Sequence, residues 1–365
     1  MKIKHLSVFF YIFCFTLTVL AQSETDVEAG KLRGAVKKIE VYFMVPQTVN
    51  GRETLAPQIY ESTVFNRQGW MIEQTSFWDG NVQTKSVYLH DRKGRRIFNQ
   101  YYGSSVFTDQ FVYKKDAEGR LAEQQKINPA MKRALTRVTL KYDSKGNVIE
   151  ENTFYLGSES PDETKVFAYD EKDRQIGQAV YDSKRVLKYK STHKFDQQDR
   201  VSETTYESEG MFEKQTFSYD TKNRLETILM FDLKKNEIIG QKVYRYDDEK
   251  LIEVVQELDQ NENLLVKTVS RLDRFGNVLR KSQSYTEAFI RKTARAYNKE
   301  LTSAEITDLM KSSGEKSDET FGYEYDEAGN WIKRFDFGVT KLSGGQINPE
   351  LKPIRTEIRT ISYYE

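Results

Sequence analysis

Aspartates recur along the chain beside aromatic residues, a combination that acid–base and sugar-handling sites use. The two clearest copies are Tyr142–Asn147 and Tyr325–Asn330, each reading Tyr-Asp, two variable residues, then Gly-Asn. Weaker copies begin at Tyr169, Phe195, Tyr219, Tyr246 and Leu272. A glycosidase needs two carboxyl groups in contrasting environments, one of them held as an acid. Equivalent aspartates repeated along one edge of a sheet do not provide that contrast, so we predict no catalytic role for them.

The same residues fit the chemistry of a tight turn between two strands. An Asp side chain at the start of a turn accepts hydrogen bonds from backbone N–H groups two residues on. The residue three places after the Asp then adopts the left-handed region, which favours Gly and tolerates Asn or Asp. Lys250 and Leu301 break this pattern, which predicts looser turns or turns of another type. The predicted structural turn residues are Asp143, Gly146, Asp170, Asp220, Asp247, Gly276, Asp326 and Gly329.

Histidine and cysteine are scarce. The chain has three His and one Cys, and both His5 and Cys14 lie in the apolar N-terminal stretch. His90 and His193 remain, each just ahead of a turn. Zinc sites and nucleophile–base pairs need clustered His, Cys and acidic residues. We therefore predict no catalytic residue, no metal site and no cofactor.

The three tryptophans all lie near turns, and two interpretations of them stay open. Trp70 directly follows Gly69, Trp331 follows Gly329 and Asn330, and Trp78 precedes a second kind of loop. Repeat arrays need distinctive end units, so Trp70 and Trp331 fit as caps at the first and last regular turns. The alternative is that Trp70, Trp78 and Trp331 are platforms on which a ligand such as a sugar stacks.

The spacing of the turns predicts the elements that carry them. The residues three places after each Asp follow one another at about 26 residues, until a double gap of 53 separates Gly276 from Gly329. Aromatic residues one and three places before each Asp share one face of a strand. This predicts an all-β fold, a repetitive antiparallel β-hairpin array of about 24 strands. Because open sheets rarely exceed about 10 strands without curling, we expect a long curled or spiral sheet with the aromatic face inward.

The double gap makes residues 284–317 ambiguous between helix and strand. A decayed copy from Tyr297 to Ser303, with Leu301 in the aligned place, would divide the gap evenly. Against this, Ser284 with Glu287 and Thr302 with Glu305 both have the spacing of a helix capping box. The length fits two β units, and we favour strands.

The N-terminus predicts export. Lys2 and Lys4 precede an uncharged run, and residues 1–21 have the pattern of a cleaved signal peptide. We expect residues 22–33 to be a flexible segment and 34–365 to form a single β-repeat domain, with regular repeats over about 58–337 and a closing strand at 353–364. The protein would then be periplasmic, surface-bound or secreted.

Charge argues against two classes of partner. Removing residues 1–21, which carry two lysines and no acid, changes the formal net charge from +1 to −1. A near-neutral chain with mixed charges has no general attraction for nucleic acid, and the basic run Arg92–Arg96 reads as a solvated turn. Neighbouring charges such as Glu150 and Glu151 would place charge on both faces of a strand, so we predict that the chain does not span a membrane.

The Tyr-Asp-x-x-Gly-Asn/Arg phrase resembles that of YD-repeat, or Rhs-type, proteins over roughly residues 58–337. The resemblance implies a long β-hairpin sheet that spirals, in large members into a shell enclosing a toxin or peptide. This chain lacks an Asp-Pro-x-Gly-Leu-like signature, and only 36 residues follow Gly329, so it is similar to short stand-alone members without a toxin domain. We expect a secreted, non-enzymatic interaction or scaffold protein of unknown ligand. The alternatives are a glycan-binding envelope protein using exposed aromatics, or a toxin-associated component.

Overall fold

The computed structural model describes residues 25–365 except 51, 132, 298, 314–316 and 340–352. The predicted signal peptide, residues 1–21, lies outside the described residues. Within the described ranges the protein is all-β, with 22 strands and three short helices. The helices are α1 (Asp26–Ala29), α2 (Glu287–Ala296) and α3 (Ser303–Ser313).

The strands follow one another along the chain, mostly 7 to 11 residues long, with a longer first pair. They are β1 (Val36–Val49), β2 (Arg52–Phe65), β3 (Met71–Trp78), β4 (Asn81–His90), β5 (Arg96–Tyr102), β6 (Val106–Lys115), β7 (Leu121–Asn128), β8 (Arg133–Tyr142), β9 (Val148–Tyr155), β10 (Glu163–Tyr169), β11 (Gln175–Asp182), β12 (Leu187–Phe195), β13 (Val201–Ser208), β14 (Met211–Tyr219), β15 (Leu225–Asp232), β16 (Glu237–Asp247), β17 (Ile252–Leu258), β18 (Leu264–Leu272), β19 (Val278–Tyr285), β20 (Ser317–Tyr325), β21 (Trp331–Val339) and β22 (Arg355–Tyr363).

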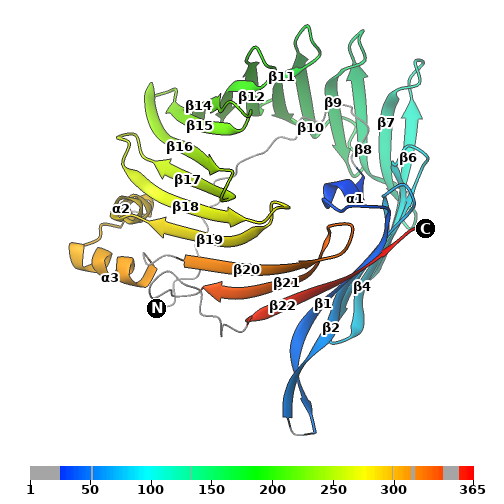
Figure 1. Cartoon of the computed structure of the whole chain (residues 1–365). Helices are drawn as coiled ribbons and strands as arrows, with labels where there is room; N and C mark the ends of the chain where they lie inside the picture. The colour runs from blue at the N-terminus through cyan, green and yellow to red at the C-terminus, as the bar shows by residue number, and fades with distance from the viewer. Residues whose placement is uncertain (1–24, 51, 132, 298, 314–316, 340–352) are drawn as a thin grey trace.

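The sheet closes on itself. Every strand pairs antiparallel with the next one along the chain, and β1 also pairs with β22, where Ile39 lies opposite Ile361 and Lys38 opposite Ser362 (Figure 1). The prediction of an open curled or spiral sheet is therefore wrong, because the 22 strands form an antiparallel β-barrel. Closure pairs the backbone N–H and C=O groups that two free edges would leave open, which is the physical reason for a ring.

Bulges in the strand pairs accompany this curvature. In the hairpin of β8 and β9 the register shifts between Lys141 and Tyr142, directly beside the turn. The same shift recurs beside the turn in β10–β11, β12–β13, β14–β15 and β18–β19. A bulge bends its strand and increases the local twist, so the repeated bulges help the sheet to curl round until its ends meet.

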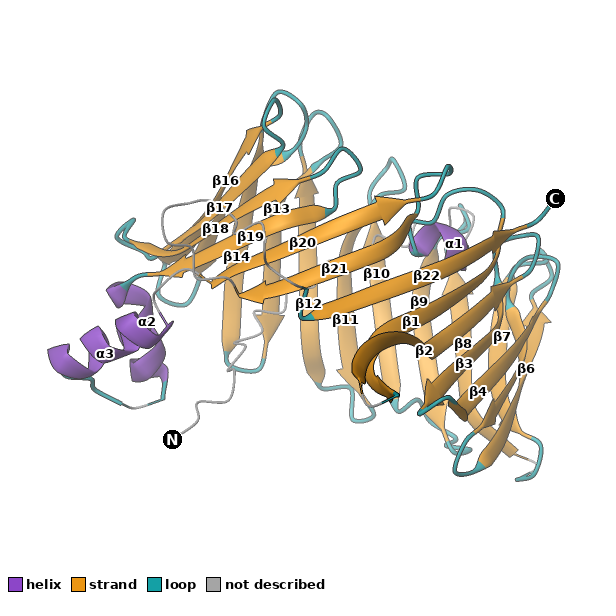
Figure 2. Ribbon diagram, turned by 60° about the horizontal axis from the view of Figure 1, so that its bottom comes forward, coloured by secondary structure: helices purple, strands orange, loops and turns teal. Residues whose placement is uncertain are grey.

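The prediction of strands in the ambiguous segment is wrong over most of its length. Residues 287–296 and 303–313 form α2 and α3, which lie together beyond the ends of β18 and β19 (Figure 2). Thr286 caps α2 by accepting a hydrogen bond from the Phe289 N–H, and Tyr297 ends that helix instead of opening a hairpin. The side chain of Glu305 accepts from the Thr302 N–H at 2.9 Å, one half of the capping box that its spacing indicates.

Helix α1 lies inside the ring of strands (Figure 1) and joins the main apolar cluster. Val27 packs there with Val36, Ile39 and Phe65, and its N–H donates to the Gly69 carbonyl at 3.1 Å. The Asp26 carboxylate accepts from the Met71 N–H at 2.6 Å. The polar composition of residues 22–33 does not predict this docking. Phe65 directly precedes the first regular turn and is buried in this cluster. The aromatic face therefore points inward at this hairpin.

Candidate binding groove and the repeat turns

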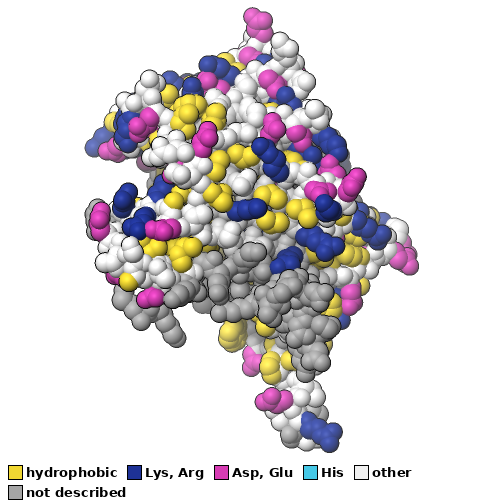
Figure 3. All heavy atoms as spheres, turned by 60° about the vertical axis from the view of Figure 1, so that its left-hand side comes forward, with side chains coloured by type: hydrophobic (Ala, Val, Ile, Leu, Met, Phe, Trp, Pro, Cys, Tyr) yellow, Lys and Arg dark blue, Asp and Glu magenta, His cyan; other side chains and the backbone are white. Residues whose placement is uncertain are grey.

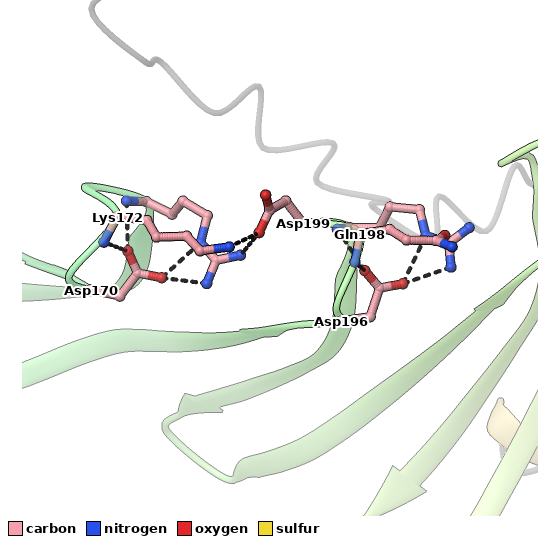
Figure 4. Close-up of polar contacts among 7 residues, drawn as sticks. Asp170, Lys172, Asp196, Gln198 and Asp199 are labelled. Atoms are coloured by element: carbon pink, nitrogen blue, oxygen red, sulfur yellow. Dashed lines mark hydrogen bonds and ion pairs between the residues drawn. The ribbon is translucent and has the colours of Figure 1, made fainter.

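The turn that begins at Asp196 shows how a repeat is closed. The Asp196 N–H donates to the Arg200 carbonyl at 2.8 Å, and the Asp199 N–H donates to the Asp196 carbonyl at 3.1 Å. The Asp196 Oδ1 atom accepts from the N–H groups of Gln198 and Arg200, at 2.8 and 2.9 Å. Figure 4 shows the same arrangement at Asp170, where each carboxylate is hydrogen-bonded within its own turn.

The other turn residues occupy equivalent places. Gly146, Gly276 and Gly329 have φ angles of 96°, 86° and 84°, in the region that favours glycine. In the turn that starts at Asp247, Lys250 is not left-handed; Leu251, one place later, has a φ of 53°. Leu301 lies between α2 and α3. The remaining aspartates accept side-chain hydrogen bonds from backbone N–H groups of their turns, at Asp143, Asp170, Asp220, Asp247 and Asp326.

Arginines link several of the turns to the next unit. The Arg200 Nε atom donates to Asp196 Oδ2 at 2.7 Å, and its guanidinium carbon lies 4.4 Å from the centre of the Tyr219 ring. The Tyr219 hydroxyl donates back to the Val201 carbonyl at 2.8 Å. A similar stack joins Arg224 to Tyr246. The recurring Asp, Arg and Tyr therefore form a structural ladder, and their polar atoms are already bonded to one another or to the backbone.

The aspartates of this ladder are held as carboxylates. The backbone N–H of Arg200 lowers the pKa of Asp196, and its guanidinium adds to that effect against the opposing effect of desolvation. The backbone N–H of Arg224 does the same for the pKa of Asp220. A general acid needs the opposite, a carboxyl group whose pKa is raised.

One pair of acids outside the ladder has contrasting pKa values. Glu213 lies opposite Asp232 across β14 and β15, and burial followed by the charge of Asp232 raises the pKa of Glu213. Asp232 is held in its own turn by the N–H groups of Lys234 and Lys235, at 2.9 and 3.1 Å. Because those bonds fix Asp232 as a turn residue, the pair resembles a structural cross-strand contact more than an acid–base couple.

The two histidines lie on separate strands and serve packing. The His90 ring stacks against Trp70 with 6.0 Å between ring centres, and burial lowers the pKa of His90. His193 contacts the Thr204 hydroxyl through Nδ1 at 3.0 Å, and burial lowers its pKa as well. Within the described part of the chain, no group of three or more His, Cys, Asp or Glu residues is arranged to hold a metal ion.

The three tryptophans differ sharply in exposure. Trp70 covers Gly94, where an added Cβ would meet the indole at 2.1 Å. Trp331 lies beneath the Arg359 guanidinium, 3.3 Å from the ring centre. Since the ring has no ends, neither residue caps an array. Trp78 is different, because 74% of its surface is exposed.

Trp78 borders an open groove of about 640 Å³ formed with β1 and β2. The rings of Phe43 and Tyr60 also line this groove, 5.0 Å apart between centres. The β1–β2 hairpin that carries them reaches beyond the ring of strands (Figure 1). The lining also contains three polar side chains, Gln58, Asp79 and Arg355, and three further apolar ones, Val45, Ile59 and Phe77.

Sequence reasoning found Trp78 but missed its partners. Phe43 lies before the regular repeats and Tyr60 at their very start, on two long strands whose register shifts between Val41 and Tyr42. Arg355 reaches the groove only because β22 closes onto β1. The one available signal was the set of aromatic residues that the repeat alignment leaves unexplained in residues 34–60.

One face of the molecule shows the mixture of charges along the chain. Figure 3 shows lysines and arginines interspersed with acidic and hydrophobic side chains on the face it displays. None of the helices in the described residues has the length and apolar character to cross a bilayer.

Comparisons with known proteins show limited similarity. No family model and no curated protein matches the chain. Similar solved structures include a Tc holotoxin pore of Photorhabdus luminescens, at 11% identity and a TM-score of 0.30 over 83% of this chain and 18% of that one. They also include a TcdB2-TccC3-Cdc42 complex, at 12% identity and a TM-score of 0.30 over 82% and 18%.

A porin-like protein from Bacteroides uniformis is similar at 10% identity and a TM-score of 0.31, over 90% of this chain and 98% of that one. The chain thus spans less than a fifth of the toxin chain and nearly all of the porin-like one. Similarity at these TM-scores establishes neither a family nor a function.

Proposed function

We propose that the protein is an exported, non-enzymatic binding protein of the bacterial envelope or exterior, and that its contact surface is the groove bordered by Phe43, Tyr60 and Trp78. The carrying observation is that these large aromatics gather at an open groove, with Trp78 74% exposed and Tyr60 50% exposed. Exposed aromatic side chains are the residues that most often dominate binding energy at recognition surfaces.

Two further features support a binding role over catalysis. The recurring carboxylates are engaged within their own turns, as at Asp196 and Asp220. The barrel gives the groove a rigid base, since β1 is paired on both sides, and rigid elements hold binding residues more accurately than loops do. Export rests on the N-terminal pattern, and the repeat phrase is similar to that of other exported repeat proteins.

Cosedimentation tests this proposal. We expect fluorescently labelled protein comprising residues 22–365 to sediment with envelope fragments of the producing bacterium. Trp78→Ala should reduce the bound fraction strongly, and Trp78→Phe should restore part of it. Tyr155→Ala is the matched control, because Tyr155 is also an exposed aromatic (49%) but lies on β9 away from the groove. Equal sedimentation of the Trp78→Ala variant and the wild type would contradict the proposal.

A further inference from the structure

We infer that the ligand of the groove is a neutral carbohydrate, whose ring stacks on Trp78 while its hydroxyls bond to Asp79, Gln58 and Arg355. This inference rests on the proposed function and names the chemical class of its ligand. The aromatic residues, the polar residues and the balance of charge each contribute a separate argument.

The aromatic residues provide apolar ring faces along an open groove. Trp78 and Tyr60 are exposed, and Phe43 lies within 5.0 Å of the Tyr60 ring centre. One face of a pyranose ring presents C–H groups, which pack against the electron-rich face of an aromatic ring. The groove volume of about 640 Å³ falls within the range of small-molecule sites, so a short saccharide fits.

The polar residues match what hydroxyl groups require. A hydroxyl donates one hydrogen bond and accepts others, so a sugar needs donors and acceptors close together. Asp79 offers acceptors, Arg355 offers donors, and the Gln58 amide offers both. Gln58 already donates to Asp79 Oδ1 at 3.3 Å, which places the two planar groups beside each other at the groove. The Arg355 guanidinium carbon lies 4.0 Å from the centre of the Phe43 ring.

The charges favour a neutral ligand over the other occupants. One carboxylate and one guanidinium among the lining residues balance each other, so neither a polyanion nor a polycation finds a single-sign field. An apolar peptide segment could cover the rings, but it would cut off water from Asp79 and Arg355 without replacing their hydrogen bonds. A neutral saccharide satisfies both the rings and the polar groups.

Titration with defined oligosaccharides tests the inference. The probes are maltohexaose, cellohexaose, laminarihexaose and xylohexaose, with heparin as the anionic comparison and a Leu-rich decapeptide as the apolar one. We expect at least one neutral hexasaccharide to bind the full protein in calorimetry, with affinity lowered at least about tenfold by Trp78→Ala. Asp79→Asn and Arg355→Lys should each weaken that binding several-fold, while Tyr155→Ala should leave it unchanged.

The outcomes separate this inference from the proposed function. If none of the neutral saccharides binds, and envelope binding depends on Trp78 but survives periodate oxidation of the glycans, the carbohydrate assignment is overturned while the binding role stands. Tighter binding of heparin or of the decapeptide than of every neutral saccharide would also overturn it. If periodate treatment abolishes the Trp78-dependent envelope binding and a hexasaccharide binds, the results support both the proposed function and the carbohydrate ligand.

Discussion

Tyr219 shows how a single residue of the repeat connects two units. Its ring receives the Arg200 guanidinium, and its hydroxyl bonds to the Val201 carbonyl at 2.8 Å. Tyr113, Tyr142, Tyr169 and Tyr246 donate to the carbonyl group at the equivalent place in the preceding unit. The repeated tyrosine therefore contributes a hydroxyl hydrogen bond as well as the packing of its ring.

Replacing Tyr219 by Phe separates the two contributions. The ring remains and the hydrogen bond is lost, so the free energy of unfolding should fall by about 0.5–1.5 kcal/mol. Urea denaturation followed by circular dichroism measures it. Tyr60→Phe is the control, because Tyr60 is half exposed in the groove and should change stability little. Equal losses in both variants would show that the hydroxyl bond to Val201 adds nothing.

Acid should destabilise the protein through the turn aspartates. Backbone N–H groups, chiefly those of Arg200 and Arg224, lower the pKa values of Asp196 and Asp220 in the folded state. Their contribution is complete above the unfolded-state pKa of about 3.9 and is lost as the pH falls from there through the lowered folded-state pKa. We expect the urea concentration at the unfolding midpoint to decrease once the pH is lowered below about 4.

A double variant, Asp196→Asn with Asp220→Asn, supplies the control for acid. An Asn side chain can still accept the N–H bonds of the turn but does not titrate. The variant should start less stable at pH 7 and lose less stability than the wild type on acidification. A parallel loss in both proteins would assign the acid sensitivity to other groups.

At the scale of elements, the turns can be tested by their glycines. Gly146 has a φ of 96°, and an added Cβ would meet nothing within 4 Å, so its cost is conformational alone. Gly94 has a φ of 77° and would also drive a Cβ into Trp70. Gly146→Ala should cost about 1–2 kcal/mol of unfolding free energy, and Gly94→Ala clearly more.

Thermal unfolding of the two alanine variants and of Gly146→Asn measures this difference. Asn tolerates the left-handed region, so Gly146→Asn should be the mildest of the three. A Gly94→Ala variant as stable as Gly146→Ala would mean that Trp70 moves aside freely.

Strands and turns could be predicted from the sequence where the interactions that decide them lie within a few residues. The hairpins around Asp143 and Asp326 could be read from the sequence, because an Asp and a Gly within four residues specify the turn. The interval around Tyr297 could not, since both a decayed hairpin and capped helices fit its length. There the Thr302–Glu305 capping signal correctly indicated a helix, whereas the even spacing of the repeats wrongly indicated a hairpin.

The site was less predictable than the turns for the same reason. Trp78 could be chosen as a candidate from its own neighbourhood, but Arg355 joins it across a strand pairing that no local pattern reveals. Phe43 lies on a strand that precedes the regular repeats, and Tyr60 lies only at their start. A sequence repeat describes what units share, whereas the groove is made of residues that the units do not share.

For the whole molecule, closure is the feature that a crosslink can verify. Lys38 and Ser362 lie directly opposite each other on β1 and β22. Facing residues on antiparallel strands have Cα atoms about 4.5–5.5 Å apart, within the range that a disulfide spans. In a Cys14→Ser background, Lys38→Cys with Ser362→Cys should oxidise to an intramolecular disulfide in nearly full yield, measured by mass and gel mobility.

The pair Lys38→Cys with Ser270→Cys is the matched control. Ser270 lies on β18, which does not pair with β1, and we expect no intramolecular bond. Absence of the Lys38–Ser362 bond in folded protein would mean that the ring is open in solution.

The seam between β1 and β22 also has a consequence for how the barrel assembles. Every other pairing among the described strands joins neighbours along the chain, so hairpins can zip one after another as they are synthesised. The seam alone brings together the two ends of the chain, from Ile39 to Ile361, and pays the entropy of one very long loop. Until it forms, the nascent sheet has two unpaired edges. At high concentration the edge of one molecule can meet that of another, so dilution during refolding should favour closed monomers over linked chains.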